Sequence, residues 1–466
     1  MAPLTIPAYM AQLQHAIDSH NGQRLAQLFD ARDSHGIQLF QALSPYDKTL
    51  NQINPTYALT FSKRFKGPLS TWSDLATLHT QVMVALNDYR PDPITQTQRY
   101  IGDVIAAFQK QHELVNTLYR WLMSSTTPTG WVLPLLYQTC RDLKNLAQLS
   151  DAQHVTRGEK PKDLEEASRL MQKCFSACVN DRGADNTTSR KMGVYFMAVI
   201  MFKTYIKLRS TALCKNLVRG IAAADLAPFE TYPRSHQVAY LYYMGLFSFL
   251  REDYIEAENN LLSALNKIHF KSNRNIELIL NYLIPVLMSR GVLPCDETLN
   301  ISSNLSTIYK PFIKAFKQGN VKLYDEQLQL AEKRLMESGT YLIVERAREG
   351  AVRALLKKVR FLTFDFKSWI LEGKPARLSI ETFQRYYKTG TGTDIDSEEM
   401  ECVLANMIYK NLIKGYISHQ HQLVVLSKQN PFPWYAPFRD RGELAKRLRE
   451  ERELRERQKM PVLAVG

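Results

Sequence analysis

The chain has 466 residues, of which 45% are hydrophobic and 23% charged, a composition typical of a folded protein of two or three domains or of an elongated repeat protein. The N-terminus, MAPLTIPAYM, lacks the basic start and apolar run of a secretory signal, and the longest uncharged stretch, 121–140, is interrupted by SSTTPTG and two prolines, so we expect a soluble intracellular protein. The net charge of +14, from 60 basic and 46 acidic residues, favours an acidic partner, either a nucleic acid or an acidic peptide.

The first half of the chain is predicted to be helical. Apolar residues recur at three- and four-residue steps, strand-like alternation is almost absent before residue 415, and Pro, Gly, Asn and Ser separate the segments. The spacing predicts helices over 6–29, 72–89, 94–124, 131–149, 164–179, 192–208 and 211–224. We expect 30–69 to be less regular, 151–162 to be a charged loop and 181–189 a polar loop.

The segment 235–269 is the clearest helix pair. Small residues at Gly245, Ala257 and Ala264 stand among large aromatic side chains, so two antiparallel helices can approach closely, as in tetratricopeptide-like hairpins. Similar helices are predicted over 275–290, 308–316 and 322–338. The aromatic stripe of the first helix is interpreted as core, with a peptide-binding groove as the alternative; its members are Tyr240, Tyr242, Tyr243, Phe247 and Phe249.

A long helix over 341–366 would close this array. Its apolar residues face inward, and its basic side contains Arg346, Arg348, Arg353, Lys357, Lys358 and Arg360. A further helix is predicted over 378–388, followed by a TGTGT turn at 389–393.

Residues 394–433 predict a helix, a turn, two strands and a proline stop. Asp396 and Glu399 have the spacing of a reciprocal N-terminal cap, and apolar residues from Met400 to Ile408 share one helical face. We expect Gly415 to end this helix in the left-handed conformation. Strands over 416–420 and 423–427, linked by two residues, would form a hairpin, and a helix that leads into a small hairpin is the end of a winged helix.

A helical array that ends in a winged helix resembles the PCI domains of the proteasome lid, the COP9 signalosome and translation initiation factor three. CVLANMIYKNLIKGYISHQHQLVVLSKQNPFP, at 402–433, resembles the C-terminus of the signalosome-subunit-twelve-like family, and AIDS at 16–19 and LILNYLIPVLMSRGVLP at 278–294 are supporting matches. The extra leucine in VVLSK and the tail beyond 437 depart from the family pattern. The expected fold class is mainly α, a degenerate tetratricopeptide-like helical-repeat array ending in a winged-helix (PCI) domain. Its predicted parts are an N-terminal helical region 1–150, helical repeats 151–340, the winged-helix end of the PCI domain 341–437, and a charged tail 438–466 that is helical or disordered.

The resemblance implies a non-catalytic scaffold subunit of a nuclear complex that couples transcription to mRNA export at the nuclear pore. Its implied partners are a large scaffold subunit, a small acidic disordered peptide of the proteasome-lid type, and RNA or DNA bound without sequence preference, with no membrane contact. The implied location is the nucleus, including the nuclear pore, with a cytoplasmic fraction allowed. One alternative is an accessory subunit of a COP9 signalosome-like or proteasome-lid-like complex with protein partners only. Another is a free-standing adaptor whose charged tail carries the function.

Nucleic-acid contact is expected from the basic segment 351–389, which holds nine basic and three acidic residues. The candidate phosphate contacts are Arg353, Lys357, Lys358, Arg360, Lys374, Arg377, Arg385 and Lys388, with an ordinary solvated face as the alternative. The acidic start of the last helix, 394–401, would repel phosphates, so insertion of this helix into a major groove is not expected. The candidate wing residues are Tyr416, His419, His421 and Lys428. The two histidines are expected to pack and form hydrogen bonds within the wing, with partner contact as the alternative.

Motifs for catalysis, metals or cofactors are not found in the sequence. There is no Walker loop, dinucleotide fingerprint, GxSxG elbow or HExxH motif. The six cysteines form no CxxC pair, and Cys174 and Cys178, which would share a helix face, are interpreted as buried thiols. We therefore expect no catalytic, metal or cofactor site.

Overall fold

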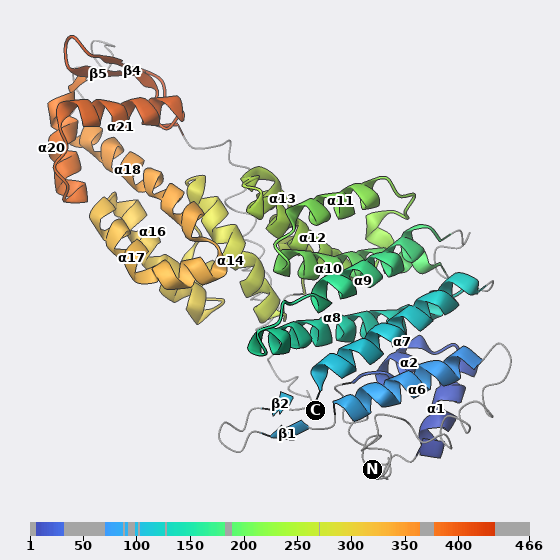
Figure 1. Ribbon diagram of the computed structural model, residues 1–466. Coiled ribbons are helices and arrows are strands. Elements are labelled where there is room, and N and C mark those ends of the chain that lie inside the picture. The colour runs from blue at the N-terminus through green and yellow to red at the C-terminus, as the bar shows by residue number, and fades with distance from the viewer. Residues whose placement is uncertain are drawn as a thin grey trace, which may run out of the picture. The chain divides into compact units, whose positions relative to one another are not determined.

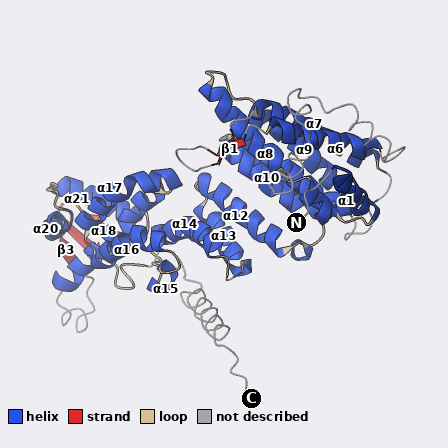
Figure 2. Ribbon diagram, turned by 90° about the horizontal axis from the view of Figure 1, so that it is seen from below, coloured by secondary structure: helices blue, strands red, loops and turns tan. Residues whose placement is uncertain are grey.

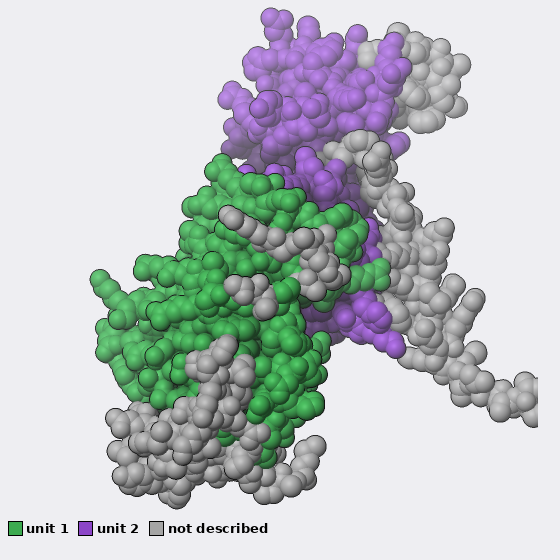
Figure 3. Space-filling model, turned by 90° about the vertical axis from the view of Figure 1, so that its right-hand side faces the viewer, with its two compact units in different colours: residues 1–243 green, residues 244–466 purple. Residues whose placement is uncertain are grey.

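The computed structural model of the chain describes residues 6–31, 70–86, 89–91, 98–100, 103–125, 128–181, 189–269, 271–363 and 377–433. Within these ranges the chain is mainly helical (Figures 1 and 2). Two compact units, residues 1–243 and 244–466, are coloured separately in Figure 3. The predictions for 32–69, 182–188, Lys374 and the tail 438–466 lie outside the described residues, and the domain limits at 150, 340 and 437 stay a prediction.

Unit 1 is built from antiparallel helices that pack on their sequence neighbours (Figure 1). Its helices are α1 (Ile6–Asp18), α2 (Gly22–Leu28), α6 (Ser70–Ala85), α7 (Val104–Ser124), α8 (Leu133–Thr156), α9 (Asp163–Val179), α10 (Val194–Lys207) and α11 (Thr211–Ala222). Short 3-10 turns are η2 (Gly130–Val132), η3 (Arg190–Gly193) and η4 (Phe229–Thr231), and β1 (Tyr89–Pro91) pairs antiparallel with β2 (Gln98–Tyr100).

The single helix predicted over 6–29 is wrong, because the chain breaks between α1 and α2. His20 has a left-handed φ of 52°, and the Asn21 side chain accepts a hydrogen bond from the N–H of Arg24 at 2.9 Å. Gly22 then presses against the Trp131 carbonyl, which lies within 3.0 Å of where a Cβ would be. Local side-chain hydrogen bonding of this kind competes with continuation of the helix. The spacing of apolar residues does not predict it.

Other predicted boundaries in unit 1 are also wrong. The helix predicted over 72–89 ends at Ala85, and Tyr89 belongs to β1. The helix predicted over 94–124 begins only at Val104, capped by the Asp103 side chain, and part of the preceding segment forms β2. The charged loop predicted to begin at residue 151 is helical as far as Thr156.

The polar residues at the end of α8 hold the start of α9. The Asp151 carboxylate accepts hydrogen bonds from the N–H groups of Lys162, Asp163 and Leu164, at 2.9 to 3.1 Å. His154 lies between two carboxylates: its Nε2 is 3.2 Å from Asp163, and its Nδ1 contacts Glu159. The hydrogen bond to Glu159, reinforced by Asp163, raises the pKa of His154 above its usual value, although burial opposes the shift.

The stability of unit 1 is therefore expected to depend on pH through His154. A raised folded-state pKa gives a stabilising contribution that is complete below the unfolded value of about 6.5 and is lost as pH rises through the folded-state pKa. In guanidinium unfolding, His154→Gln should cost more stability at about pH 6 than at about pH 8. An equal cost at both pH values would contradict the ion-pair assignment.

Unit 2 begins inside α12 (Arg234–Leu250). Its further helices are α13 (Tyr254–Lys267), α14 (Asn273–Ser289), α15 (Asp296–Leu299), α16 (Ser303–Gln318), α17 (Val321–Ser338), α18 (Tyr341–Thr363), α20 (Ile380–Thr391) and α21 (Ser397–Tyr409). Its strands are β3 (Arg377–Ser379), β4 (Gly415–Ser418) and β5 (Leu423–Leu426), which form one antiparallel sheet in the order β3-β5-β4.

The helix hairpin predicted at 235–269 is confirmed as α12 and α13. Gly245 faces Leu261 of the partner helix, whose Cγ would lie 2.7 Å from a Cβ at this position, so only glycine permits the observed approach. Phe249, Ala257 and Val286 continue the core toward α18. Of the predicted aromatic stripe, Phe247 and Phe249 are buried, whereas the three tyrosines are half-buried.

The winged helix at the end of the chain is confirmed, with changes in its details. The predicted capping box is present, since Asp396 accepts from the Glu399 N–H at 2.7 Å and Glu399 accepts from the Asp396 N–H at 3.2 Å. The predicted helix at 378–388 begins instead as strand β3, and α20 continues to Thr391, inside the predicted turn.

The predicted helix stop at Gly415 is wrong. The helix α21 ends at Tyr409, and Asn411 takes the left-handed conformation with a φ of 57°. Gly415 instead opens β4, where the Val425 carbonyl leaves no room for a Cβ. The hairpin link has four residues, 419–422, rather than two, and Gln422 supplies its left-handed φ of 52°.

Candidate nucleic-acid interface

The predicted basic side of α18 is largely neutralised at its N-terminal end. Arg346 pairs with Glu252 at 2.7 Å, and Arg348 forms a two-point ion pair with Asp325 at 2.6 and 2.8 Å. The Asp325 carboxylate raises the pKa of Arg348, against the opposing effect of burial. These ion pairs join α18 to the α12–α13 turn and to α17, and they leave little charge for a ligand.

Arg353 is buried and does not face solvent as the sequence hypothesis requires. Its side chain is 6% exposed, and its Nη2 donates to the carbonyl oxygens of Phe432 and Pro433, each at 2.7 Å. The guanidinium therefore holds the NPFP segment against α18. This burial removes Arg353 from the candidate phosphate contacts.

The remaining basic residues of α18 differ in exposure. Lys358 is exposed and donates to the Gln318 carbonyl at 2.7 Å, whereas Lys357 is half-buried. Arg360 is also half-buried, its guanidinium lies 5.8 Å from the ring centre of Phe361, and burial lowers its pKa. Lys358 is therefore the most accessible of the three.

The basic residues of α20 are exposed but paired with acids. Arg385 lies 3.0 Å from Glu381 one turn away, and Lys388 pairs with Asp394. Exposed pairs of this kind are weak, at about 0–1 kcal/mol, so the cations remain exchangeable, but the paired acids reduce the local positive potential.

Arg377 and Tyr416 lie on the same face of the winged-helix sheet, one on each side of the central strand β5. Both residues stand directly opposite Val425 on β5, Arg377 from β3 and Tyr416 from β4, so the three side chains share one face of the sheet. Arg377 is exposed, and the Tyr416 side chain is 63% exposed. The opposite face contains Leu378 and Val424, which are buried, as expected for a sheet with one solvated side.

Two exposed lysines, Lys414 and Lys428, lie near the same end of this sheet. Lys414 precedes β4, Lys428 follows β5, and the Ser427 N–H donates to the Lys414 carbonyl at 2.8 Å, which closes this end of the hairpin. We call Arg377, Lys414, Tyr416 and Lys428 the wing face. Proteins that bind single strands without sequence preference combine exposed aromatic rings, on which bases can stack, with cations along the same surface.

The other end of the hairpin is acidic and internally bonded. Glu401 of α21 accepts hydrogen bonds from His419 at 2.9 Å and from the Gln422 amide at 2.9 Å. These bonds fix the turn, and the hydrogen bond to Glu401 raises the pKa of His419. The predicted role of His419 in wing hydrogen bonding fits this geometry, while His421 is exposed beside it. The wing therefore has a basic end and an end in which charges are paired.

Sequence reasoning named Arg377, Tyr416 and Lys428 but did not bring them together, and it missed Lys414. Strand β3 has only three residues, Arg377 to Ser379, which is too short for an alternation signal. Pairing between β3 and β5 is the feature that joins the two parts of the wing face.

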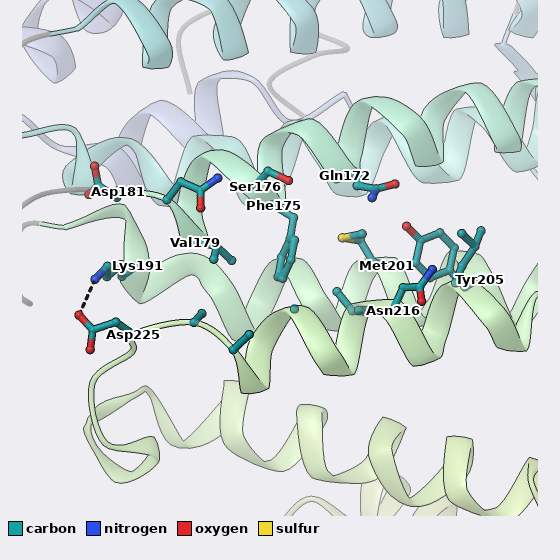
Figure 4. Close-up of a pocket in the computed structure, with 16 residues that line it drawn as sticks. Gln172, Phe175, Ser176, Val179, Asp181, Lys191, Met201, Tyr205, Asn216 and Asp225 are labelled. Atoms are coloured by element: carbon teal, nitrogen blue, oxygen red, sulfur yellow. Dashed lines mark ion pairs between the residues drawn. The ribbon is translucent and has the colours of Figure 1, made fainter.

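A cavity in unit 1, of about 540 Å³, lies between α9, α10 and α11 (Figure 4). Its wall mixes polar and apolar side chains, with Phe175 and Met201 facing it. The charged groups at one end already satisfy each other: Lys191 pairs with Asp225 at 3.5 Å, and Asp181 forms a two-point ion pair with Arg190. The cavity therefore presents no uncompensated charge to a ligand.

Groups typical of metal or membrane proteins are not found in the ranges that the structure describes. No cluster of three or more His, Cys, Asp or Glu could hold a metal ion there, and no helix there is long and apolar enough to cross a bilayer. Cys174 and Cys178 are buried as free thiols, as predicted, and burial raises the pKa of Cys178.

Comparison with known proteins places these features in a family. The PCI domain model matches residues 376–428, the segment that contains β3, α20, α21 and the hairpin. The chain is 35% identical to "Protein CSN12 homolog" of Mycosarcoma maydis over 82% of this chain and 89% of that protein. It is 31% identical to "PCI domain-containing protein 2" of Xenopus laevis, over 93% and 98% of the two chains, and 31% identical to "Enhanced ethylene response protein 5" of Arabidopsis thaliana, over 78% and 82%.

Proposed function

This chain belongs to the family of PCI-domain scaffold proteins that includes CSN12 homologues and PCI domain-containing protein 2, and from that premise we propose that it is a non-catalytic subunit of a nuclear mRNA-export complex. In this role it binds a large scaffold subunit and a small acidic peptide, and it couples transcription to export at the nuclear pore. It binds RNA or DNA without sequence preference through the wing face.

The observation that carries the nucleic-acid part is that Arg377 and Tyr416 flank Val425 on one face of the sheet. The ring supplies a surface for stacking a base, and the guanidinium supplies a phosphate contact beside it. Neither interaction reads base identity, which agrees with binding that is independent of sequence. The acidic residues of α21 lie toward the other end of the hairpin, where Glu401 is bonded to His419 and Gln422.

Two single variants test this surface by different signatures. Tyr416→Ala removes a stacking contact worth about 1–3 kcal/mol and should weaken binding of single-stranded nucleic acid at least fivefold, with an unchanged salt dependence. Arg377→Gln removes a phosphate contact and should reduce the slope of log affinity against log salt by about 0.7. The affinity and the salt slope of each variant are measured by fluorescence anisotropy of a labelled oligothymidylate across a salt series.

Tyr409→Ala is the matched control, because Tyr409 is 85% exposed and lies on α21, outside the wing face. It should bind as the unmodified chain does. If Tyr409→Ala and Tyr416→Ala change the affinity for oligothymidylate equally, the wing face is not the binding surface.

The second candidate function is an accessory subunit of a COP9 signalosome-like complex with protein partners only. The name CSN12 homolog, shared by several fungal relatives, favours it. Affinity purification from cells separates the two: recovery of an export scaffold and pore proteins supports the first, and recovery of signalosome subunits supports the second.

A further inference from the structure

The exposed side of the C-terminal half of α16 is basic. Lys310, Lys314 and Lys317 recur at steps of four and three residues, so they form one row, and all three are exposed. The helix, SNLSTIYKPFIKAFKQ, contains no carboxylate, and its opposite side, including Tyr309, Phe312 and Phe316, is buried. The amphipathic pattern therefore leaves only cations and neutral polar groups facing solvent.

The charges of this row are not neutralised by neighbouring acids. In the part of the chain that the structure describes, no carboxylate lies within ion-pair distance of Lys314 or Lys317, and Lys310 donates to the Asn300 side chain at 2.9 Å. This contrasts with α18 and α20, where Arg346, Arg348, Arg385 and Lys388 all have acidic partners.

Two contacts link the end of α16 and the start of α17 to α18 and α20. At the end of α16, Lys358 of α18 donates to the Gln318 carbonyl at 2.7 Å, which brings a fourth exposed lysine next to Lys317. At the start of α17, the exposed Lys322 lies beside Gly392 at the end of α20, its Cδ 3.4 Å from where a Cβ would be. Both contacts lie within unit 2.

Resting on the proposed function, we propose that the row Lys310–Lys314–Lys317 binds the sugar-phosphate backbone of the nucleic acid held at the wing face. The binding track then runs past Lys358 and Lys322 along the helical array. Seven residues of helix span about 10 Å, and a nucleic-acid strand carries one charge per roughly 3.4 Å, so the row faces about three phosphates.

A phosphate backbone fits this face better than an acidic peptide does. Protein partners gain most of their affinity from apolar anchors buried in pockets, and none of the exposed large hydrophobic side chains of the described residues belongs to α16. Backbone contacts with nucleic acid need only cations. The neighbouring α17 differs, because Leu330 and Met336 are exposed there among mixed charges.

The test compares two triple variants of the full chain. Lys310→Gln, Lys314→Gln and Lys317→Gln together remove the row, while Lys215→Gln, Arg219→Gln and Lys333→Gln remove the same charge from exposed positions on α11 and α17. Thermal unfolding establishes that both variants stay folded. Binding is measured with a labelled oligothymidylate across a salt series, and with labelled polyglutamate as an acidic-peptide probe.

The row variant should lower the salt slope by about two and weaken oligothymidylate binding roughly tenfold or more at moderate salt, while the control variant keeps the parental slope. Equal losses in both variants, or a loss confined to polyglutamate, would overturn the proposal. If the row variant binds oligothymidylate as the unmodified chain does while Arg377→Gln binds it more weakly, the proposed role of the lysine row is wrong but the proposed function stands. If the unmodified chain shows no salt-dependent binding, both the lysine-row proposal and the nucleic-acid part of the proposed function are wrong.

Discussion

Replacing Arg353 with methionine is expected to lower the free energy of unfolding of unit 2 by about 2–4 kcal/mol. The guanidinium is 6% exposed and satisfies two carbonyl oxygens, those of Phe432 and Pro433. A hydrogen bond from a charged donor contributes about 1.5–3 kcal/mol, and its loss leaves both carbonyls without this donor. Methionine keeps much of the apolar stem, so the loss reports mainly on the hydrogen bonds.

Hydrogen exchange gives this prediction a local readout. The Lys414 N–H donates to the Pro431 carbonyl at 2.8 Å, next to the buried Phe432, so release of the NPFP segment should speed exchange at Lys414. The matched control is Arg385→Met, which removes an exposed arginine paired with the exposed Glu381 and should change stability by no more than about 0.5 kcal/mol. The loss of stability in Arg353→Lys should be smaller than in Arg353→Met and larger than in Arg385→Met, because an ammonium group donates hydrogen bonds but lacks the planar fork of the guanidinium. If Arg353→Met proves as mild as Arg385→Met, the structural role of Arg353 is refuted.

Most helices of this protein could be predicted from the chain because each carries its own local signals. The α12–α13 hairpin follows from the small residues Gly245, Ala257 and Ala264, and α21 follows from the Asp396–Glu399 capping box. The predictions are wrong where a local interaction that the apolar pattern does not contain determines where a helix ends. Asn21 and the contact of Gly22 with Trp131 divide the first helix, and Asn411 rather than Gly415 supplies the left-handed turn after α21.

The candidate site was less predictable, because charge in a sequence does not reveal its neighbours. Arg353 was assigned to a basic side but is buried against the NPFP carbonyls, and Lys388 was assigned to phosphate but pairs with Asp394. The placement of Arg377 and Tyr416 on one face of the sheet depends on strand pairing between segments far apart in the chain. Such long-range register has no signature in either segment alone.

Gly350→Ala is expected to destabilise unit 2 by about 1–2 kcal/mol, although alanine is the better helix former. Gly350 lies in α18, and a Cβ there would come within 3.0 Å of Cε2 and Cζ of Phe316 on α16. Phe316 is 6% exposed, so its ring has no solvent to move into. The overpacking cost therefore exceeds the gain of about 1 kcal/mol in helix propensity.

Gly220→Ala is the matched control, since nothing lies within 4 Å of its Cβ position on α11, and it should raise stability by up to about 1 kcal/mol. If Gly350→Ala lowers stability while Gly220→Ala raises it, the effect comes from the α16–α18 contact. Adding Phe316→Leu to Gly350→Ala should then recover part of the lost stability. A stabilising Gly350→Ala would contradict the close approach.

Because this approach seats α16 against α18 while Lys358 bonds to Gln318, the Gly350→Ala variant should also weaken nucleic-acid binding if the lysine row acts as proposed. The packing of one glycine thus bears on both the fold of unit 2 and the path of its proposed ligand.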